Sequence, residues 1–185
     1  MKKLLFVFIL ICLAISLFSA DKDFVIENYT LVKYTGTSKY VSLPSGIRKI
    51  GKEAFKDTSV SSVSCTYTNL ETIEDKAFYN CSNLSSIDLP YSLREIGSYA
   101  FYNCSWLKRI SIPQNIYRVG YNAFAYSGVQ ELTFKMNTYD TVNSCQNKTR
   151  YGFEGMNNLQ YILYEFAYNK ILVYEKRTGK YYWKK

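Results

Sequence analysis

The cysteines are the residues of this chain best suited to chemistry. Beyond the first twenty residues they stand at positions 65, 81, 104 and 145. An even number of cysteines permits disulfides in an exported chain. A thiol nucleophile would need a neighbouring base, and the chain contains no histidine to act as one. The absence of histidine also removes the commonest metal ligand. The composition therefore favours structural cysteines over catalytic ones.

Spacing argues against most disulfide pairings. Cys81 and Cys104 are 23 residues apart, and each lies in an Asn-Cys-Ser tripeptide. Equivalent side chains of stacked repeats run parallel, which opposes the geometry of a bridge, although a bond between adjacent repeats stays open. Cys65 occupies a position that other repeats fill with Leu or Ile, so we expect it to be buried. Cys145 has no assigned partner.

Asn-x-Ser/Thr sequons offer a second kind of chemistry. They begin at Asn28, Asn80, Asn83, Asn103 and Asn147. If the host is a eukaryote, Asn28 and Asn147 are the preferred glycosylation sites, because both are expected in loops. The repeated Asn-Cys-Ser is better explained by the preference of asparagine for turns.

Basic and aromatic residues gather at the C-terminus. Lys176, Arg177, Lys180, Lys184 and Lys185 flank the run Tyr181-Tyr182-Trp183, a composition that could bind a sulfated glycan or an acidic membrane surface. The same segment also has the pattern of a hairpin, with Gly179 in the turn between two strands. We favour a hairpin that covers the edge of the last strand and needs no ligand.

The N-terminus predicts export. Lys2 and Lys3 precede an uncharged, mostly apolar run from Leu4 to Ala20, which is typical of a secretory signal peptide. An uncleaved membrane anchor is the alternative. Removing residues 1–20 takes away two lysines and lowers the net charge from +8 to +6. A mild positive charge favours acidic partners, but it is also a common device for solubility.

A repeat of 23 residues must position all of these groups. Ala-Phe recurs with Phe at positions 55, 78, 101 and 124, and an aliphatic residue stands five residues before each Phe and another eight before it. Gly51, Gly97 and Gly120 form a further column, which we expect in a turn with positive φ. The small alanine before each Phe predicts a tight helical turn, with the ring filling the interior.

Each repeat also contains a short strand. Ile87 and Leu89 alternate with polar residues, and the same pattern predicts strands near residues 40–43, 62–65, 86–89, 109–112, 131–134 and 161–164. Ordering one repeat of ~23 residues costs more backbone entropy, at ~1–2 kcal/mol per residue, than burying its six or so apolar side chains returns. Neighbouring copies must therefore stack and share one core.

At this point the sequence resembles the BspA-type (Treponema-type) leucine-rich repeat. Leu70-x-x-Ile73-x-x-x-Ala77-Phe78-x-Asn80-Cys81-Ser82-x-Leu84-x-x-Ile87-x-Leu89-Pro90 carries the resemblance, which covers residues 23–164. It implies a parallel-sheet solenoid with an N-terminal cap hairpin. Together with the six strand segments and the C-terminal hairpin pattern, this predicts an α/β-like but mostly β, right-handed leucine-rich-repeat solenoid with one parallel sheet of about six short strands and β-hairpin caps at both ends. The resemblance also implies exported surface proteins that bind host matrix or partner cells, with no catalytic residue and no cofactor.

These features divide the chain into five parts. They are a signal peptide (1–20), an N-terminal cap and half-repeat (21–46), four repeats of about 23 residues (47–135), an insertion with a degenerate last repeat (136–164) and a C-terminal hairpin cap (165–185).

The outward-facing strand residues are the candidate ligand-binding site. By alternation they are Tyr40, Ser42, Ser62, Ser64, Ser86, Asp88, Arg109, Ser111, Glu131, Thr133 and Tyr161. Solenoids commonly bind on such a concave sheet. The alternative is a merely solvated face, because its middle is mostly serine. The 19 tyrosines give a second candidate, an aromatic contact surface. The alternative is that these tyrosines are half-buried and only fill space in the repeat turns.

The function that fits these features is adhesion or recognition outside the cell, secreted or at the cell surface, through a protein or glycan ligand. The alternative is a secreted structural protein that assembles with itself. We expect no enzyme activity, no cofactor, no metal and no nucleic-acid partner. Membrane contact is expected only through the N-terminal segment if it is not cleaved.

Overall fold

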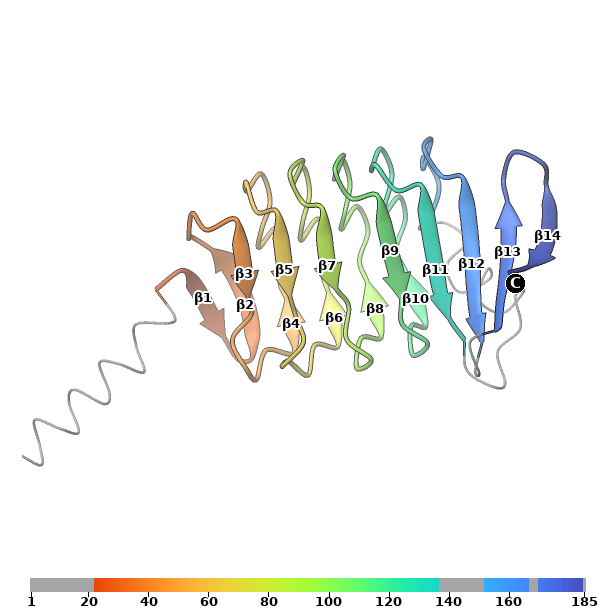
Figure 1. The fold of residues 1–185 in the computed structure, drawn as a ribbon. Helices are drawn as coiled ribbons and strands as arrows, with labels where there is room; N and C mark the ends of the chain where they lie inside the picture. The colour runs from red at the N-terminus through yellow and green to blue at the C-terminus, as the bar shows by residue number, and fades with distance from the viewer. Residues whose placement is uncertain (1–21, 137–151, 167–169, 185) are drawn as a thin grey trace, which may run out of the picture.

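The protein is an elongated stack of similar rungs. The computed structural model describes residues 22–136, 152–166 and 170–184. Figure 1 shows the strands of successive rungs side by side from the N-terminal to the C-terminal end. The described residues contain no helix, so none can cross a membrane as a helix. The prediction of a mostly β solenoid is confirmed.

Six strands form one side of the stack, which we call the strand face. They are β3 (Tyr40–Ser42), β5 (Ser62–Ser64), β7 (Ser86–Asp88), β9 (Arg109–Ile112), β11 (Glu131–Lys135) and β12 (Tyr161–Phe166). All six lie where the sequence predicts them. They are not one continuous sheet, however: β3, β5 and β7 form one parallel sheet, and β9, β11 and β12 belong to another.

A second side of the stack carries a sheet of which the sequence analysis predicted only the N-terminal hairpin. It consists of β1 (Phe24–Glu27), β2 (Thr30–Tyr34), β4 (Lys49–Ile50), β6 (Thr72–Ile73), β8 (Glu95–Ile96) and β10 (Arg118–Val119). Apart from the β1–β2 hairpin its strands pair in parallel, with Ile50 opposite Ile73 and Ile73 opposite Ile96. The aliphatic column five residues before each Phe is therefore a strand ladder.

The third side is built from tight turns, which we call the turn face. The amide of Phe55 donates to the Ala77 carbonyl at 2.8 Å, and that of Phe78 donates to the Ala100 carbonyl at the same distance. The residue two before each Phe has φ near +60°, as at Glu53 and Lys76, and so does the residue two after it. A left-handed residue interrupts a right-handed helix. The predicted helical turn is therefore wrong.

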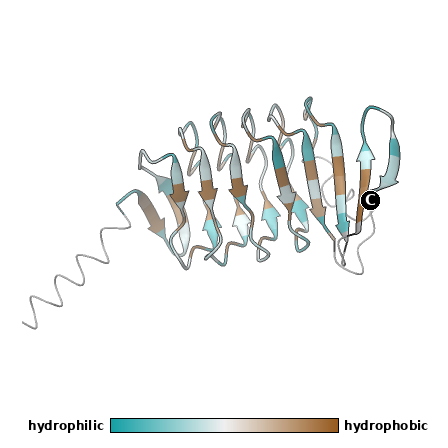
Figure 2. Ribbon diagram, viewed as in Figure 1, coloured by the Kyte–Doolittle hydropathy of each residue, from teal (hydrophilic) through white to brown (hydrophobic). Residues whose placement is uncertain are grey.

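One row of stacked rings forms the core. Phe55, Phe78, Phe101 and Phe124 are fully buried, and their ring centroids are 4.8, 5.2 and 5.1 Å apart in successive pairs. Tyr34 extends the row at the N-terminal end and Phe153 at the C-terminal end. The predicted alignment of these residues is confirmed. Figure 2 shows hydrophobic residues recurring at the same level of neighbouring strands.

A hairpin closes each end of the row. β1 and β2 are joined by Asn28 and Tyr29, both with positive φ, as a two-residue hairpin turn requires. At the other end β13 (Lys170–Glu175) pairs antiparallel with β12, and β14 (Lys180–Trp183) pairs with β13. Gly179 lies in the turn with φ +66°. The two predicted hairpin caps are confirmed.

The glycine column has a different cause from the one predicted. Gly51, Gly97 and Gly120 do not have positive φ. A Cβ atom at Gly97 would lie 2.5 Å from the Asp75 backbone nitrogen, and one at Gly120 would lie 2.4 Å from the Ser98 nitrogen. These glycines are needed because the backbone of the preceding rung passes too close for any side chain.

We predict that Gly120→Ala destabilises the protein by about 1–3 kcal/mol, because the new methyl group must push two rungs apart. Urea denaturation followed by circular dichroism measures this change. Gly179→Asn is the matched control, because a Cβ there meets open space and asparagine tolerates a positive φ. Equal stability of the two variants would contradict the close-approach explanation.

Candidate functional site

The predicted site residues lie together on the strand face. Across the rungs Tyr40 is opposite Ser62, and Ser62 is opposite Ser86. Arg109, Glu131 and Tyr161 form the equivalent row in the second sheet. None of the eleven predicted residues is buried, while alternate strand residues face the core. The structure therefore places them on one open surface, and their role in binding stays a prediction.

The strand face is polar and only lightly charged. Ser86 donates its hydroxyl hydrogen to the Ser62 hydroxyl oxygen at 2.9 Å. The Arg109 guanidinium lies 4.0 Å from the Glu131 carboxylate, at the limit of an ion pair between exposed side chains. Asp88, the remaining charged residue of the predicted set, forms no ion pair with any described residue. Hydrogen-bonding hydroxyl groups therefore dominate this surface.

The ladder of the strand face is broken between β7 and β9. In other rungs the amide of the first strand residue donates to the carbonyl of the residue just before the neighbouring strand. The Ser62 amide donates to the Lys39 carbonyl at 3.0 Å, and the Glu131 amide donates to the Lys108 carbonyl at 3.2 Å. Among the described residues the corresponding bond from Arg109 to Ser85 is not formed, and β7 and β9 are not paired.

The break is confined to the strand face. On the turn face the Asn80 amide still donates to the Tyr102 carbonyl at 2.8 Å across the same two rungs. On the second side β6 and β8 pair in register. The two rungs are therefore hydrogen-bonded on two sides, while on the strand face β7 and β9 remain neighbours without pairing.

A crevice of about 260 Å³ lies at the break. Ile87 and Leu89 line it and are only partly buried, whereas the residues of the same columns in the next rung, Ile110 and Ile112, are buried. The rest of the lining consists of Ser86, Asp88, Arg109, Ile110 and Ser111. The crevice thus combines an apolar lining, opposite charges and main-chain groups without a ladder partner.

Comparison with known proteins settles what kind of repeat this is. The sequence model of the BspA type leucine rich repeat region matches residues 25–160, in six copies. The chain belongs to the BspA-type leucine-rich-repeat family. No curated protein matches the chain.

Solved structures of two leucine-rich repeat proteins and of a pneumococcal antigen share the fold. A leucine-rich repeat protein from Bacteroides capillosus is 27% identical, with a TM-score of 0.52, and the match covers 57% of this chain and 85% of that one. The pneumococcal vaccine antigen PcpA is 21% identical (TM-score 0.62; 77% of this chain, 35% of that one). The leucine-rich repeat protein TpLRR of T. pallidum is 23% identical (TM-score 0.51; 74% and 77%).

The cysteines of the BspA-type repeats are buried free thiols. Cys81 donates to the Phe55 carbonyl at 2.9 Å, and Cys104 donates to the Phe78 carbonyl at 3.3 Å. Burial raises the pKa of Cys81 to about 11 and that of Cys65 to about 12, and it raises the pKa of Cys104 well above its usual range. The thiols are therefore protonated at physiological pH and serve the turns. Cys145 lies outside the described residues.

The sequon asparagines in the repeats also serve the turns. Asn80 donates its side-chain amide to the Asp57 carboxylate at 2.6 Å, and Asn103 donates to the Asn80 side-chain oxygen at 2.6 Å. All three residues have φ near +60°. Asn28 is exposed in its hairpin turn, and Asn147 lies outside the described residues. Glycosylation of Asn28 and Asn147 stays a prediction.

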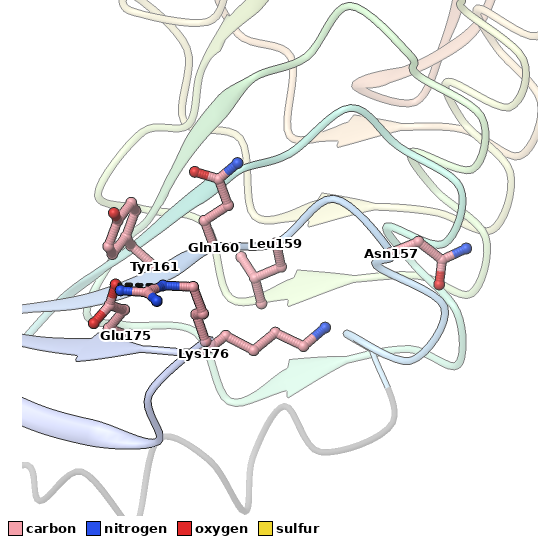
Figure 3. Close-up of a pocket in the computed structure, with 7 residues that line it drawn as sticks. Asn157, Leu159, Gln160, Tyr161, Glu175 and Lys176 are labelled. Atoms are coloured by element: carbon pink, nitrogen blue, oxygen red, sulfur yellow. Dashed lines mark ion pairs between the residues drawn. The ribbon is translucent and has the colours of Figure 1, made fainter.

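A second hollow, of about 570 Å³, lies where the last rung meets the turn of the C-terminal hairpin (Figure 3). Its lining includes Gln160, Tyr161 and Lys176. Arg177 forms an ion pair of 3.6 Å with Glu175, which removes part of the positive charge proposed for this end. In the described residues no group of three acidic or thiol side chains is arranged to hold a metal ion.

We predict that iodoacetamide at pH 9 leaves Cys65, Cys81 and Cys104 of the folded protein unmodified, because only a thiolate is alkylated and their pKa values lie higher. In guanidinium chloride at the same pH the pKa values return toward their ordinary range and all three react. Peptide mapping by mass spectrometry reads each site separately from Cys145. Alkylation of Cys65 in the folded state, or recovery of a disulfide-linked peptide, would contradict this assignment.

Proposed function

We propose that this BspA-type repeat protein is exported and recognises a protein or glycan ligand on its strand face, with the crevice between β7 and β9 at the centre of the contact. The support comes from one observation, the break in an otherwise regular ladder. Natural sheets pair or cover their strand edges, and an opening between two packed rungs exposes backbone groups that a ligand can satisfy.

The lining of the crevice supports this choice over the rest of the strand face. Ile87 and Leu89 offer apolar surface that the equivalent residues of neighbouring rungs hide in the core. A volume of about 260 Å³ is below the ~300–1,000 Å³ of small-molecule pockets and is suited to one side chain or one sugar unit. Asp88 and Arg109 would then orient a ligand that carries groups of both charges.

Recognition is proposed in preference to catalysis by a histidine-activated or thiol nucleophile. The sequence contains no histidine, and the described thiols are buried and protonated. Function in a repeat fold resides in exposed positions that the core leaves free.

Ser111→Trp tests the site, because Ser111 is exposed and lines the crevice, so that a larger side chain there should compete with a ligand for the space. Labelled mature protein, residues 21–185, is applied to an array of glycans and extracellular-matrix proteins. We expect Ser111→Trp, and Arg109→Glu, to weaken binding to the captured component by at least about tenfold, which corresponds to ~1.4 kcal/mol. Arg118→Glu is the control, because Arg118 is exposed on the side that carries β10 and pairs there with Glu95.

Wild-type affinity in both strand-face variants would refute a site at the crevice, as would the absence of any captured component. A mature protein that forms large assemblies in size-exclusion chromatography and binds nothing would favour the structural role instead.

Export makes a separate prediction. The full chain should appear outside the cytoplasm with an N-terminus near Asp21, whereas a chain without residues 1–20 should stay inside, because the apolar run and Lys2–Lys3 direct translocation. Cell fractionation and N-terminal sequencing check both. An identical distribution of the two chains would contradict export by this segment.

A further inference from the structure

The C-terminal hairpin lines a second surface, separate from the crevice. Figure 3 shows the hollow of about 570 Å³ described above, which we call the larger hollow, with Tyr161 at one end, Asn157 at the other and Lys176 extended between them. A smaller hollow of about 190 Å³ lies where the strand face meets the hairpin, and it is lined by Glu131, Tyr161, Leu163, Val173, Tyr182 and Lys184. The two hollows are neighbours, because Tyr161 lines both.

The floor of the smaller hollow is apolar, unlike the rest of the strand face. Leu163 lies opposite Thr133 on one side and opposite Val173 on the other, and directly opposite side chains share one side of a sheet. In the other strands the corresponding residues are polar, namely Ser42, Ser64, Asp88, Ser111 and Thr133. Leu163 and Val173 are only 7% and 4% exposed, yet neither belongs to the continuous core. The strand face therefore changes from mainly hydroxyl groups to an apolar floor at β12 and β13.

Two tyrosine rings flank this floor. Tyr182 lies opposite Val173 and is 47% exposed, and Tyr161 lies opposite Glu131. Within the described residues no other aromatic ring contacts either of them. Because their faces are not covered by a second ring, they can receive the C–H face of a sugar ring, and pockets of this composition bind small polar molecules with an apolar side.

Each hollow also contains a lysine without a charged partner. The carboxylates of the lining each have an arginine within ion-pair distance, in the pairs Glu131–Arg109 (4.0 Å) and Glu175–Arg177 (3.6 Å). Lys176 of the larger hollow and Lys184 of the smaller are exposed, and neither forms an ion pair with a described residue. The uncompensated charge of both hollows is therefore positive, and a ligand that complements it carries an anionic group for each.

Amide side chains complete the larger hollow. Asn157 and Gln160 line it, and an amide group both donates and accepts hydrogen bonds. Neighbouring hydroxyl groups of a sugar present the same combination of donors and acceptors. The concave shape favours a chain of rings over an acidic membrane, because a flat surface cannot enter a hollow.

We propose that the two hollows bind an acidic oligosaccharide of at least two units, with one anionic group at Lys176, another at Lys184, and a sugar ring packed against Tyr161 or Tyr182. Carboxylated and sulfated glycans share this chemistry. The C-terminal hairpin then has two roles, because it caps the stack and supplies half of a binding site. The proposal does not depend on a ligand in the crevice.

Isothermal titration calorimetry of the mature protein, residues 21–185, tests the proposal. The probes are hexasaccharides of hyaluronan, which carries carboxylates, and of chondroitin sulfate, which carries sulfates as well. We expect at least one of them to bind. Lys176→Gln and Lys184→Gln should each weaken that binding by about three- to fivefold, and the double variant by about tenfold or more, because each removes one partly exposed ion pair. Tyr182→Ser should weaken it by about fivefold through the lost ring contact.

Lys180→Gln is the matched control, because Lys180 is exposed on the same hairpin and lines neither hollow. All of these variants change exposed residues and should keep the melting temperature of the wild type. Polyglutamate offers anions without sugar rings, so it should bind more weakly and without a response to Tyr182→Ser. Ser111→Trp should leave hexasaccharide binding unchanged, so failure at the crevice and failure of this proposal are distinguishable.

Four results would overturn the proposal. They are the absence of binding by both hexasaccharides, an equal loss in Lys180→Gln and Lys184→Gln, wild-type affinity in Tyr182→Ser, and binding to vesicles that contain phosphatidylserine in place of the hexasaccharides. The second result would mean that the positive charge of the hairpin acts diffusely, and the last would mean that the hairpin contacts a membrane surface.

Discussion

The rest of the structure depends on the contact between one rung and the next. A single rung has only short strands, of two to six residues, and cannot bury its own apolar side chains. Phe78 is fully buried only because Phe55 and Phe101 cover its two faces, at 4.8 and 5.2 Å. Backbone bonds on the sides of the stack hold the rungs at that separation, so ring stacking and hydrogen bonding enforce the same spacing. At Gly120 this separation leaves room for no more than a hydrogen atom.

Periodicity in the sequence was sufficient to predict the parts of the fold that repeat a large apolar side chain. The Phe column, the six strands of the strand face and the C-terminal hairpin follow from residue type and spacing, whereas the N-terminal hairpin was predicted from the family resemblance. The second sheet was missed because its strands contain two residues, such as Lys49–Ile50, and two residues show no alternation. The role of the glycine column was missed because two different constraints, a close approach between rungs and a positive φ, both select glycine.

The candidate site was predictable only in outline. Alternation places Ser86, Asp88 and Arg109 on the outer side of their strands, and the structure agrees. Nothing in the sequence marks the break between β7 and β9, because residues 86–90 and 109–113 have the same alternation and both end in proline. The break depends on the fit of two whole rungs. The sequence offered the tyrosines as an aromatic surface, but the ring contacts among Tyr79, Tyr102 and Tyr126 could not be predicted, because the residues come from different columns that only the fold brings together.

The direction of the backbone bonds on the turn face explains why the two ends of the stack differ. There the amides donate toward the C-terminal end, as from Phe55 to Ala77 and from Phe101 to Ala123. The carbonyl groups of the first turn therefore need a donor from outside the repeats. The N-terminal hairpin provides one, because the Tyr34 amide donates to the Ala54 carbonyl at 2.9 Å. The fourth turn needs acceptors, and the degenerate last repeat supplies the carbonyl groups of Gly152 and Gly155 for the amides of Phe124 and Tyr126. Removing the degenerate repeat would leave the amides of Phe124 and Tyr126 without partners, and Phe124 is fully buried. The sequence of this repeat can therefore diverge, but its backbone must stay in place.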